Sequence, residues 1–191
     1  MSSPARTGPR AVAFLRAINV GGRTVTMERL RTRFEELGLE GVWTFLASGN
    51  VIFDAPEEGL VGLDRRIELH LKEHLGYEVV TFLRTEAEVA AVAAHRAFPA
   101  TEMQRAGALN VAFLARRLPA AGRRALSDFG DLGTDIDRFH VHGREVYWLC
   151  RVKQSESTFS NALFERRTGV KATFRSLSTV RKLAARLVAG A

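Results

Sequence analysis

Hydrophobic positions along this chain recur with two spacings, one of two residues and one of three to four residues. The first spacing is typical of β-strands with two distinct faces, and the second is typical of amphipathic helices. In the first half of the chain the pattern predicts strand, helix, two strands, helix, strand and helix, in that order. We expect these elements at residues 11–19, 26–37, 42–47, 51–54, 60–75, 77–83 and 86–95.

The same order of elements returns after residues 98–107, a stretch that holds Pro and Gly and has no periodicity. Residues 75–84 and 168–175 are also similar in sequence, and an Ala-rich amphipathic helix is expected after each. We therefore predict an α+β fold of two tandem, internally duplicated ferredoxin-like units, each an alpha-beta plait built on a split βαβ motif. The second set of elements is expected at residues 109–114, 123–129, 139–142, 145–149, 158–167, 170–175 and 178–187.

The predicted domain organisation follows from this repeat. A polar stretch with Ser, Pro, Thr and Gly precedes the first strand, which predicts a disordered tail. The four predicted segments are a tail at 1–10, a first unit at 11–98, a linker at 99–107 and a basic second unit at 108–191. A unit of this kind covers one face of its sheet with helices, so the other faces, which are also apolar, are expected to pack against each other or against a second chain.

Positive charge is concentrated in the second half. The formal net charge is +7, yet residues 1–106 hold 13 Lys and Arg against 14 Asp and Glu, whereas residues 107–191 hold 15 against 7. This asymmetry favours an anionic partner, either a small molecule or a nucleic acid. The alternative is compositional, because 24 of the 28 basic residues are Arg in an Ala-rich chain, as a GC-rich genome produces without selection for binding.

Composition also bears on location and redox chemistry. The longest apolar runs have about ten residues and contain Arg or Asn, so they are too short to span a bilayer. Cys150 is the only cysteine, which excludes an internal disulfide and a cysteine-based zinc cluster. We expect a cytoplasmic protein without membrane contact, present as a monomer or homodimer.

The first candidate binding residues surround the end of the first strand. Arg16 and Asn19 lie in this apolar strand, and Gly21 and Gly22 follow before a helix. An arginine in such a strand needs an acid, a carbonyl or an anionic ligand, and the N–H groups of a helix N-terminus hold anions. The alternatives are a structural ion pair and a tight strand-to-helix turn.

Ser48 and Asn50 belong to a predicted hairpin turn. If the two units pack through their sheet faces, these two residues join Arg16 and Asn19 in one cleft between the units. The alternative is hairpin chemistry alone, since Gly49 and Asn50 tolerate positive φ.

A second candidate anion site precedes the helix expected at 158–167. Arg151 and Lys153 lead into Ser157, and basic side chains next to a hydroxyl-rich helix N-terminus suit phosphate. Asn161 lies on the helix side opposite the apolar residues, facing solvent or the seam between units. Ordinary N-capping is the alternative.

Two histidines match a zinc-peptidase pattern. The segment from His70 to His74 has the form HxxEH, which places both imidazoles on one helix face. No third ligand follows at a helical distance, and His140 and His142 are expected on a strand of the other unit. The sequence therefore predicts no metal site and no cofactor.

The sequence offers few residues that would support nucleic-acid binding or catalysis. Tyr147 and Trp148 on a hairpin strand could stack bases as aromatic residues on RNA-binding sheets do, or could belong to the core. No Ser-His-Asp order, carboxylate pair or nucleotide fingerprint is present. The sequence leaves open whether the chain is an enzyme.

Several motifs resemble those of one bacterial family. They lie at residues 13–22, 48–53, 160–163 and 179–183. Together they resemble the uncharacterised family known as domain of unknown function 1697 (DUF1697). The resemblance implies two ferredoxin-like units and no established activity. We expect a binding protein for an anionic, phosphorylated small molecule or a nucleic acid; the alternative is an enzyme acting on an anionic small molecule in the cleft between the units.

Overall fold

A computed structural model of the protein divides into two compact units. It describes residues 8–19, 22, 24–46, 49–130 and 136–189. The first unit consists of residues 1–91 together with 182–191, and the second consists of residues 92–181. Each unit is built on one four-stranded antiparallel sheet.

The first unit has the strand order β2-β3-β1-β4. Its central strand β1 pairs with β3 on one side, with Phe14 opposite Asn50, and with β4 on the other, with Leu15 opposite Thr81. The elements are β1 (Arg10–Leu15), α1 (Met27–Glu35), β2 (Trp43–Thr44), β3 (Asn50–Asp54), α2 (Leu63–Leu75), β4 (Thr81–Thr85) and most of α3 (Glu86–Ala94), whose last residues belong to the second unit.

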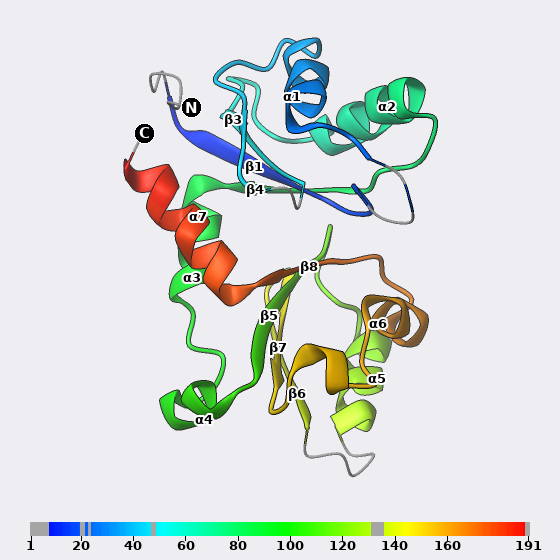
Figure 1. The fold of residues 1–191 in the computed structure, drawn as a ribbon, viewed down its shortest axis with the longest axis vertical. Helices are drawn as coiled ribbons and strands as arrows, with labels where there is room; N and C mark the ends of the chain where they lie inside the picture. The colour runs from blue at the N-terminus through cyan, green and yellow to red at the C-terminus, as the bar shows by residue number, and fades with distance from the viewer. Residues whose placement is uncertain (1–7, 20–21, 23, 47–48, 131–135, 190–191) are drawn as a thin grey trace. The chain divides into compact units, whose positions relative to one another are not determined.

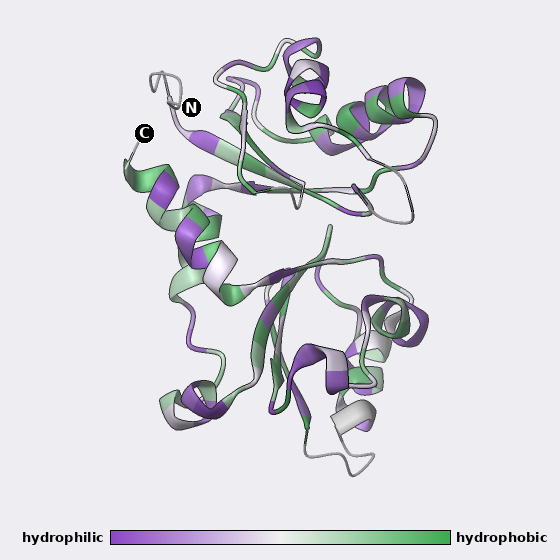
Figure 2. Ribbon diagram, viewed as in Figure 1, coloured by the Kyte–Doolittle hydropathy of each residue, from purple (hydrophilic) through white to green (hydrophobic). Residues whose placement is uncertain are grey.

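Helices α1 and α2 cover the same face of this sheet, as Figure 1 shows. Both helices alternate hydrophilic and hydrophobic stretches (Figure 2). Helix α1 has Thr26 as its N-cap, because the Thr26 Oγ1 accepts a hydrogen bond of 3.1 Å from the Arg29 N–H. Every second residue of β1 points into this core. The main buried contributors are Ala11, Ala13, Leu15, Leu30, Phe34, Val51, Phe53, Ile67 and Leu71.

Residues from the far end of the chain complete the first unit. The guanidinium carbon of Arg186 lies 5.9 Å from the centroid of the Trp43 ring, and that of Arg10 lies 5.8 Å from the same ring. Both distances are in the range of a cation–π interaction. The indole of β2 therefore contacts a residue from each end of the sequence.

The second unit repeats the strand order, with β6-β7-β5-β8. The described residues thus form two four-stranded antiparallel sheets and seven α-helices, an α+β fold consistent with two ferredoxin-like units. Internal duplication stays a prediction. The elements are α4 (Ala100–Arg105), β5 (Ala108–Phe113), α5 (Ala120–Gly130), β6 (Asp137–His142), β7 (Glu145–Cys150), the 3-10 helix η1 (Gln154–Glu156), α6 (Asn161–Thr168), β8 (Thr173–Ser176) and the start of α7 (Leu177–Ala189). The rest of α7, from residue 182 on, belongs to the first unit.

One face of the second sheet carries an aromatic core. The rings of Trp148 and Phe159 have centroids 4.8 Å apart, and Phe164 and Phe174 lie 5.5 Å apart edge to face. Because successive residues of a strand point to opposite faces, Tyr147 lies on the other face of the sheet from Trp148. That other face holds the candidate functional site.

The first strand is shorter than its hydropathy indicates. The predicted strand over 11–19 ends at Leu15, because Ala17 (φ 64°) and Asn19 (φ 56°) adopt left-handed backbone conformations. The placement of Arg16 in mid-strand is therefore wrong. The partner strand is shortened as well: β4 begins at Thr81 rather than at residue 77, since Thr81 pairs with the last residue of β1.

Two segments expected to be irregular are ordered. Arg10, placed in the tail, opens β1 and is 1% exposed. The stretch 99–107, expected as a linker, contains helix α4, whose first residue follows Pro99, and proline with its fixed φ suits a helix start. No helix among the described residues is both long and apolar enough to cross a membrane.

Candidate functional site

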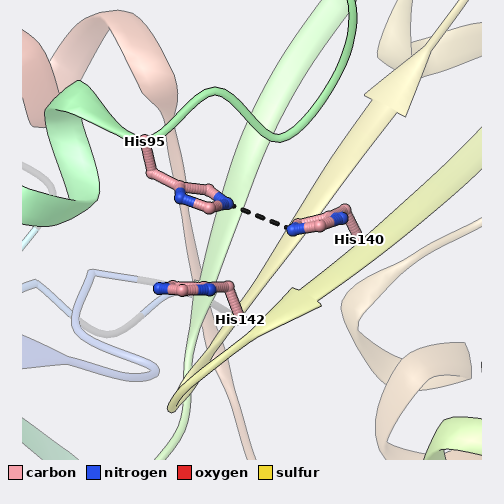
Figure 3. Close-up of side chains that lie close together, drawn as sticks. All are labelled: His95, His140 and His142. Carbon is pink, nitrogen blue, oxygen red and sulfur yellow. Dashed lines mark hydrogen bonds between the residues drawn. The ribbon is translucent and has the colours of Figure 1, made fainter.

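Three histidines of the second unit come together on the face of the sheet opposite the aromatic core (Figure 3). His95 follows the last residue of α3, whereas His140 and His142 are separated by one residue on β6 and so share a face. The Nε2 atoms of His95 and His140 are 3.1 Å apart. One ring nitrogen from each of the three residues lies within 4.8 Å of the other two.

The neighbouring strand β7 supports the three rings. In the β6–β7 ladder Tyr147 stands opposite His140, and Glu145 stands opposite His142. The Tyr147 hydroxyl donates a hydrogen bond of 3.1 Å to the carbonyl of Val92, and its ring centroid lies 5.0 Å from that of His95. Tyr147 thus holds the end of α3, and with it His95, above the sheet.

The surroundings favour neutral imidazoles. Burial lowers the pKa of His95, and the neighbouring His142 and His140 lower it further, against an opposite effect of Glu145. Burial and His142 likewise lower the pKa of His140. A neutral imidazole has one ring nitrogen with a free lone pair, which can accept a proton or bind a metal ion.

A pocket of about 800 Å³ adjoins the histidines in the same unit. Phe98 belongs to both sites, since it lines the pocket and its ring lies 6.3 Å from that of His140 in an edge-on arrangement. Arg96 and Arg181 are among the lining residues, beside Met103 and Leu109, and the Arg181 Nε donates a hydrogen bond of 3.3 Å to the carbonyl of Ala93. An ion pair between Glu102 and Arg138 ties α4, which forms one wall, to β6.

The predicted site around the glycine pair is in part a structural turn. The Asn19 Oδ1 accepts a hydrogen bond of 2.6 Å from the N–H of Val25, which closes the loop ahead of α1. Gly22 has a φ of 80°, a conformation that favours glycine. Gly21 lies outside the described residues.

Arg16 and Asn50 occupy different environments. Arg16 is half-buried after the end of β1, and its N–H donates to the carbonyl of Val80 at 2.8 Å. Asn50 is fully buried at the start of β3, where its Nδ2 donates to the Phe45 carbonyl at 2.9 Å. Ser48 lies outside the described residues.

The structure does bring these two motifs of the first unit together. The N–H of Leu15 donates to the carbonyl of Gly49 at 2.8 Å. A Cβ added to Gly49 would lie 3.3 Å from the Cβ atoms of Leu15 and Ile18, so a larger residue there would crowd the strand end. Whether these residues bind a ligand stays a prediction.

The predicted second anion site is spread over two local structures. Arg151 and Lys153 are exposed, and Lys153 caps the short helix η1. The Ser157 hydroxyl donates to the Asp137 carboxylate at 2.7 Å and accepts from the N–H of Phe159 at 2.9 Å. Both hydrogen bonds fix the turn that leads to α6.

Helix α6 begins at Asn161, three residues later than the sequence predicts. Ser160 is its N-cap, with an Oγ that accepts from the N–H of Leu163 at 3.2 Å. Asn161 is half-buried, and its Oδ1 is a buried atom without a hydrogen-bond partner among the described residues. Ligand binding by Asn161 also stays a prediction.

The two aromatic residues considered for base stacking are core residues. Tyr147 and Trp148 are each 2% exposed, and the Trp148 Nε1 donates to the Asp137 Oδ1 at 2.7 Å. A buried ring cannot stack on a nucleotide base. The alternative interpretation, that these rings belong to the core, is confirmed.

Sequence reasoning missed the histidine cluster. It ended the third helix at His95 inside the first unit and treated His140 and His142 as strand residues of the other unit. The alternation His140-Val141-His142 on a strand was the available signal, since it places two imidazoles on one face. The position of His95 over that face depends on how the chain turns after α3.

The other histidine pair is already held by its neighbours. The His70 Nε2 lies 3.1 Å from the Glu36 Oε2, and both oxygens of Glu36 accept hydrogen bonds from Arg33. The Nδ1 of His74 is hydrogen-bonded to the His70 carbonyl at 2.9 Å. A cation at this second cluster would face the positive charge of the Arg33 guanidinium.

Comparison with known proteins gives a family and a fold. The profile described as "protein of unknown function (DUF1697)" matches residues 9–147. No protein with curated annotation matches. A solved structure of a conserved bacterial protein from Streptococcus pneumoniae is similar with a TM-score of 0.71 and 20% sequence identity, over 94% of this chain and 98% of that one.

Proposed function

We propose that this chain, which belongs to the DUF1697 family of proteins of unknown function, binds an anionic small molecule in the pocket of the second unit. The observation that carries the proposal is the pair of arginines, Arg96 and Arg181, in one pocket. Among the described residues that line the pocket, none has a carboxylate side chain. The two guanidinium groups therefore leave a positive charge for a ligand to neutralise.

The rest of the lining indicates what kind of anion fits. Phe98, Met103 and Leu109 offer apolar surface, while Gln104 adds a neutral polar group. A volume of about 800 Å³ is in the range of small-molecule sites. We infer a ligand with a phosphate or carboxylate at one end and an aromatic or aliphatic body, such as a nucleoside monophosphate.

A small molecule is favoured over a nucleic acid because the exposed aromatic platform that single strands need is missing at the predicted position. Tyr147 and Trp148, the residues expected to stack bases, are buried. The enzyme alternative keeps one support, since the histidines next to Phe98 could serve as acid–base groups. The predicted cytoplasmic location and monomeric or homodimeric state remain part of this proposal.

Isothermal titration calorimetry with AMP and with inorganic pyrophosphate tests the proposal. We expect Arg96→Gln and Arg181→Gln each to weaken AMP binding about tenfold, the effect of losing one charge-assisted hydrogen bond of about 1.5 kcal/mol. Arg124→Gln, at an exposed arginine of α5, is the matched control and should leave the affinity unchanged.

Two outcomes contradict the proposal. One is a titration in which neither AMP nor pyrophosphate gives a heat of binding. The other is AMP binding that Arg96→Gln and Arg181→Gln leave intact. Binding of a short RNA alone that weakens with salt and responds equally to Arg124→Gln would instead assign the interaction to the general basic surface.

A further inference from the structure

The three histidines of the second unit have the spacing of metal ligands. Two nitrogen ligands at about 2.0–2.1 Å from one tetrahedral zinc ion are about 3.4 Å apart. The Nε2 atoms of His95 and His140 are 3.1 Å apart, so this pair is already at that spacing. The ligand nitrogens of all three lie within 4.8 Å of one another. A ring nitrogen of His142 therefore has to approach the other two by at most about 1.4 Å to reach the same spacing.

His142 is the ring that is able to make this adjustment. It is exposed and ends β6, directly before the turn at Gly143, so few neighbours restrict its side-chain torsions. Its ring is stacked on that of His95, as Figure 3 shows. The two ring centroids are 4.1 Å apart. A rotation about the side-chain torsions of His142 brings a ring nitrogen toward the other two.

The surroundings suit a bound cation. Glu145 stands opposite His142 in the strand ladder and is 7% exposed, which places a shielded carboxylate beside the cluster. Tyr147 and Phe98 add an apolar wall, with ring centroids 6.2 and 6.3 Å from that of His140. Carboxylates and apolar groups around the ligands orient imidazoles and limit the access of water.

We propose that His95, His140 and His142 form a binding site for one divalent transition-metal ion, with zinc as the reference ion. Three imidazole ligands leave a fourth coordination position for water or a substrate atom, which is the donor set of catalytic zinc sites. Imidazole ligands also suit copper, nickel and iron, and geometry and availability decide among them. The site does not depend on the anion pocket, although Phe98 borders both.

A purely structural role for the cluster is the competing explanation. In that case one imidazole donates a hydrogen bond to another, and the third stacks on the pair. The two explanations differ in what the cluster does with added metal. Partial exposure of His95 and His140 gives an ion a path to the ligand atoms.

Zinc titration of the tag-free, EDTA-treated full chain tests the proposal. We expect one zinc ion per chain by calorimetry and a rise in melting temperature with zinc concentration, because the ion binds the native state. His142→Ala, at an exposed residue that ends β6, should weaken zinc binding at least about 100-fold while leaving the cooperative unfolding transition of the zinc-free protein in place. Cobalt(II) added in place of zinc should give the visible absorption of a tetrahedral site, and His142→Ala should abolish it.

The double variant His70→Ala/His74→Ala is the matched control, since it removes two imidazoles from the other cluster. It should leave the zinc stoichiometry, the affinity and the cobalt spectrum unchanged. Zinc binding that survives His142→Ala and is lost in the double variant would overturn the proposal. So would the absence of zinc binding by the folded, EDTA-treated protein.

Discussion

Ser157→Ala separates a structural role of this hydroxyl from ligand binding. The substitution removes the hydrogen bond donated to the Asp137 Oδ2 and the one accepted from the Phe159 N–H. A hydrogen bond to a carboxylate contributes about 1.5–3 kcal/mol and a neutral one about 0.5–1.5 kcal/mol. Water replaces part of this at the half-buried Ser157, so we expect the free energy of unfolding to fall by about 2 kcal/mol.

Urea unfolding followed by the fluorescence of Trp148 measures this loss. A Trp43→Phe background makes Trp148 the only tryptophan, and its Nε1 hydrogen bond to Asp137 places it in the affected network. Ser127→Ala is the matched control: Ser127 is exposed on α5 and its hydroxyl donates only to the carbonyl of Arg123, one turn earlier, in the described contacts. Alanine suits a helix at least as well as serine, so this control should not lose stability.

One result would refute the structural assignment of Ser157. If Ser157→Ala lost less than about 0.5 kcal/mol, as little as the control, the two hydrogen bonds would contribute nothing measurable. If the same variant then bound AMP or pyrophosphate more weakly than the parent protein, the hydroxyl would belong to a ligand site together with Arg151 and Lys153.

Two further predictions concern the same unit. Gly107→Ala should lower the stability by about 1–3 kcal/mol and the melting temperature with it, because the added Cβ would lie 2.1 Å from the backbone oxygen of Val152; an unchanged thermal unfolding curve would contradict this. Burial raises the pKa of the Cys150 thiol, so a thiol reagent should modify it only after unfolding. The unfolded thiol ionises at a lower pH than the folded one, so the contribution of Cys150 to stability should be complete below the unfolded pKa and be lost as pH rises through the folded pKa. Cys150→Ala should remove this pH dependence. A thiol that reacts in the native protein as fast as in the unfolded protein would contradict its burial.

The sequence predicted most elements of the fold because their signals are local. The helix expected from residue 26 begins at Met27 with Thr26 as its N-cap, and the helix expected up to residue 75 ends at Leu75, since capping and helical period depend on residues a few positions apart. The end of β1 was missed because hydropathy does not reveal that Ala17 and Asn19 adopt positive φ. The resemblance to DUF1697 is confirmed by the family match.

The candidate site was beyond these local signals. His95 and His140 are 45 positions apart, and only the turn after α3 brings them into contact. The same turn places Arg96 and Phe98 in the pocket with Arg181, which no periodicity connects. The polar residues that the sequence singled out at strand ends and turns, such as Asn19 and Ser157, form hydrogen bonds that hold those turns.

The contact between Trp43 and Arg186 has a consequence for folding during synthesis. The first unit includes residues 182–191, which a ribosome adds after the whole of the second unit. A nascent chain that ends before these residues lacks part of the first unit, so its folding cannot be completed strictly from the N-terminus onward. A segment that follows the second unit in the chain therefore decides when the first unit, most of which precedes the second, reaches its final structure.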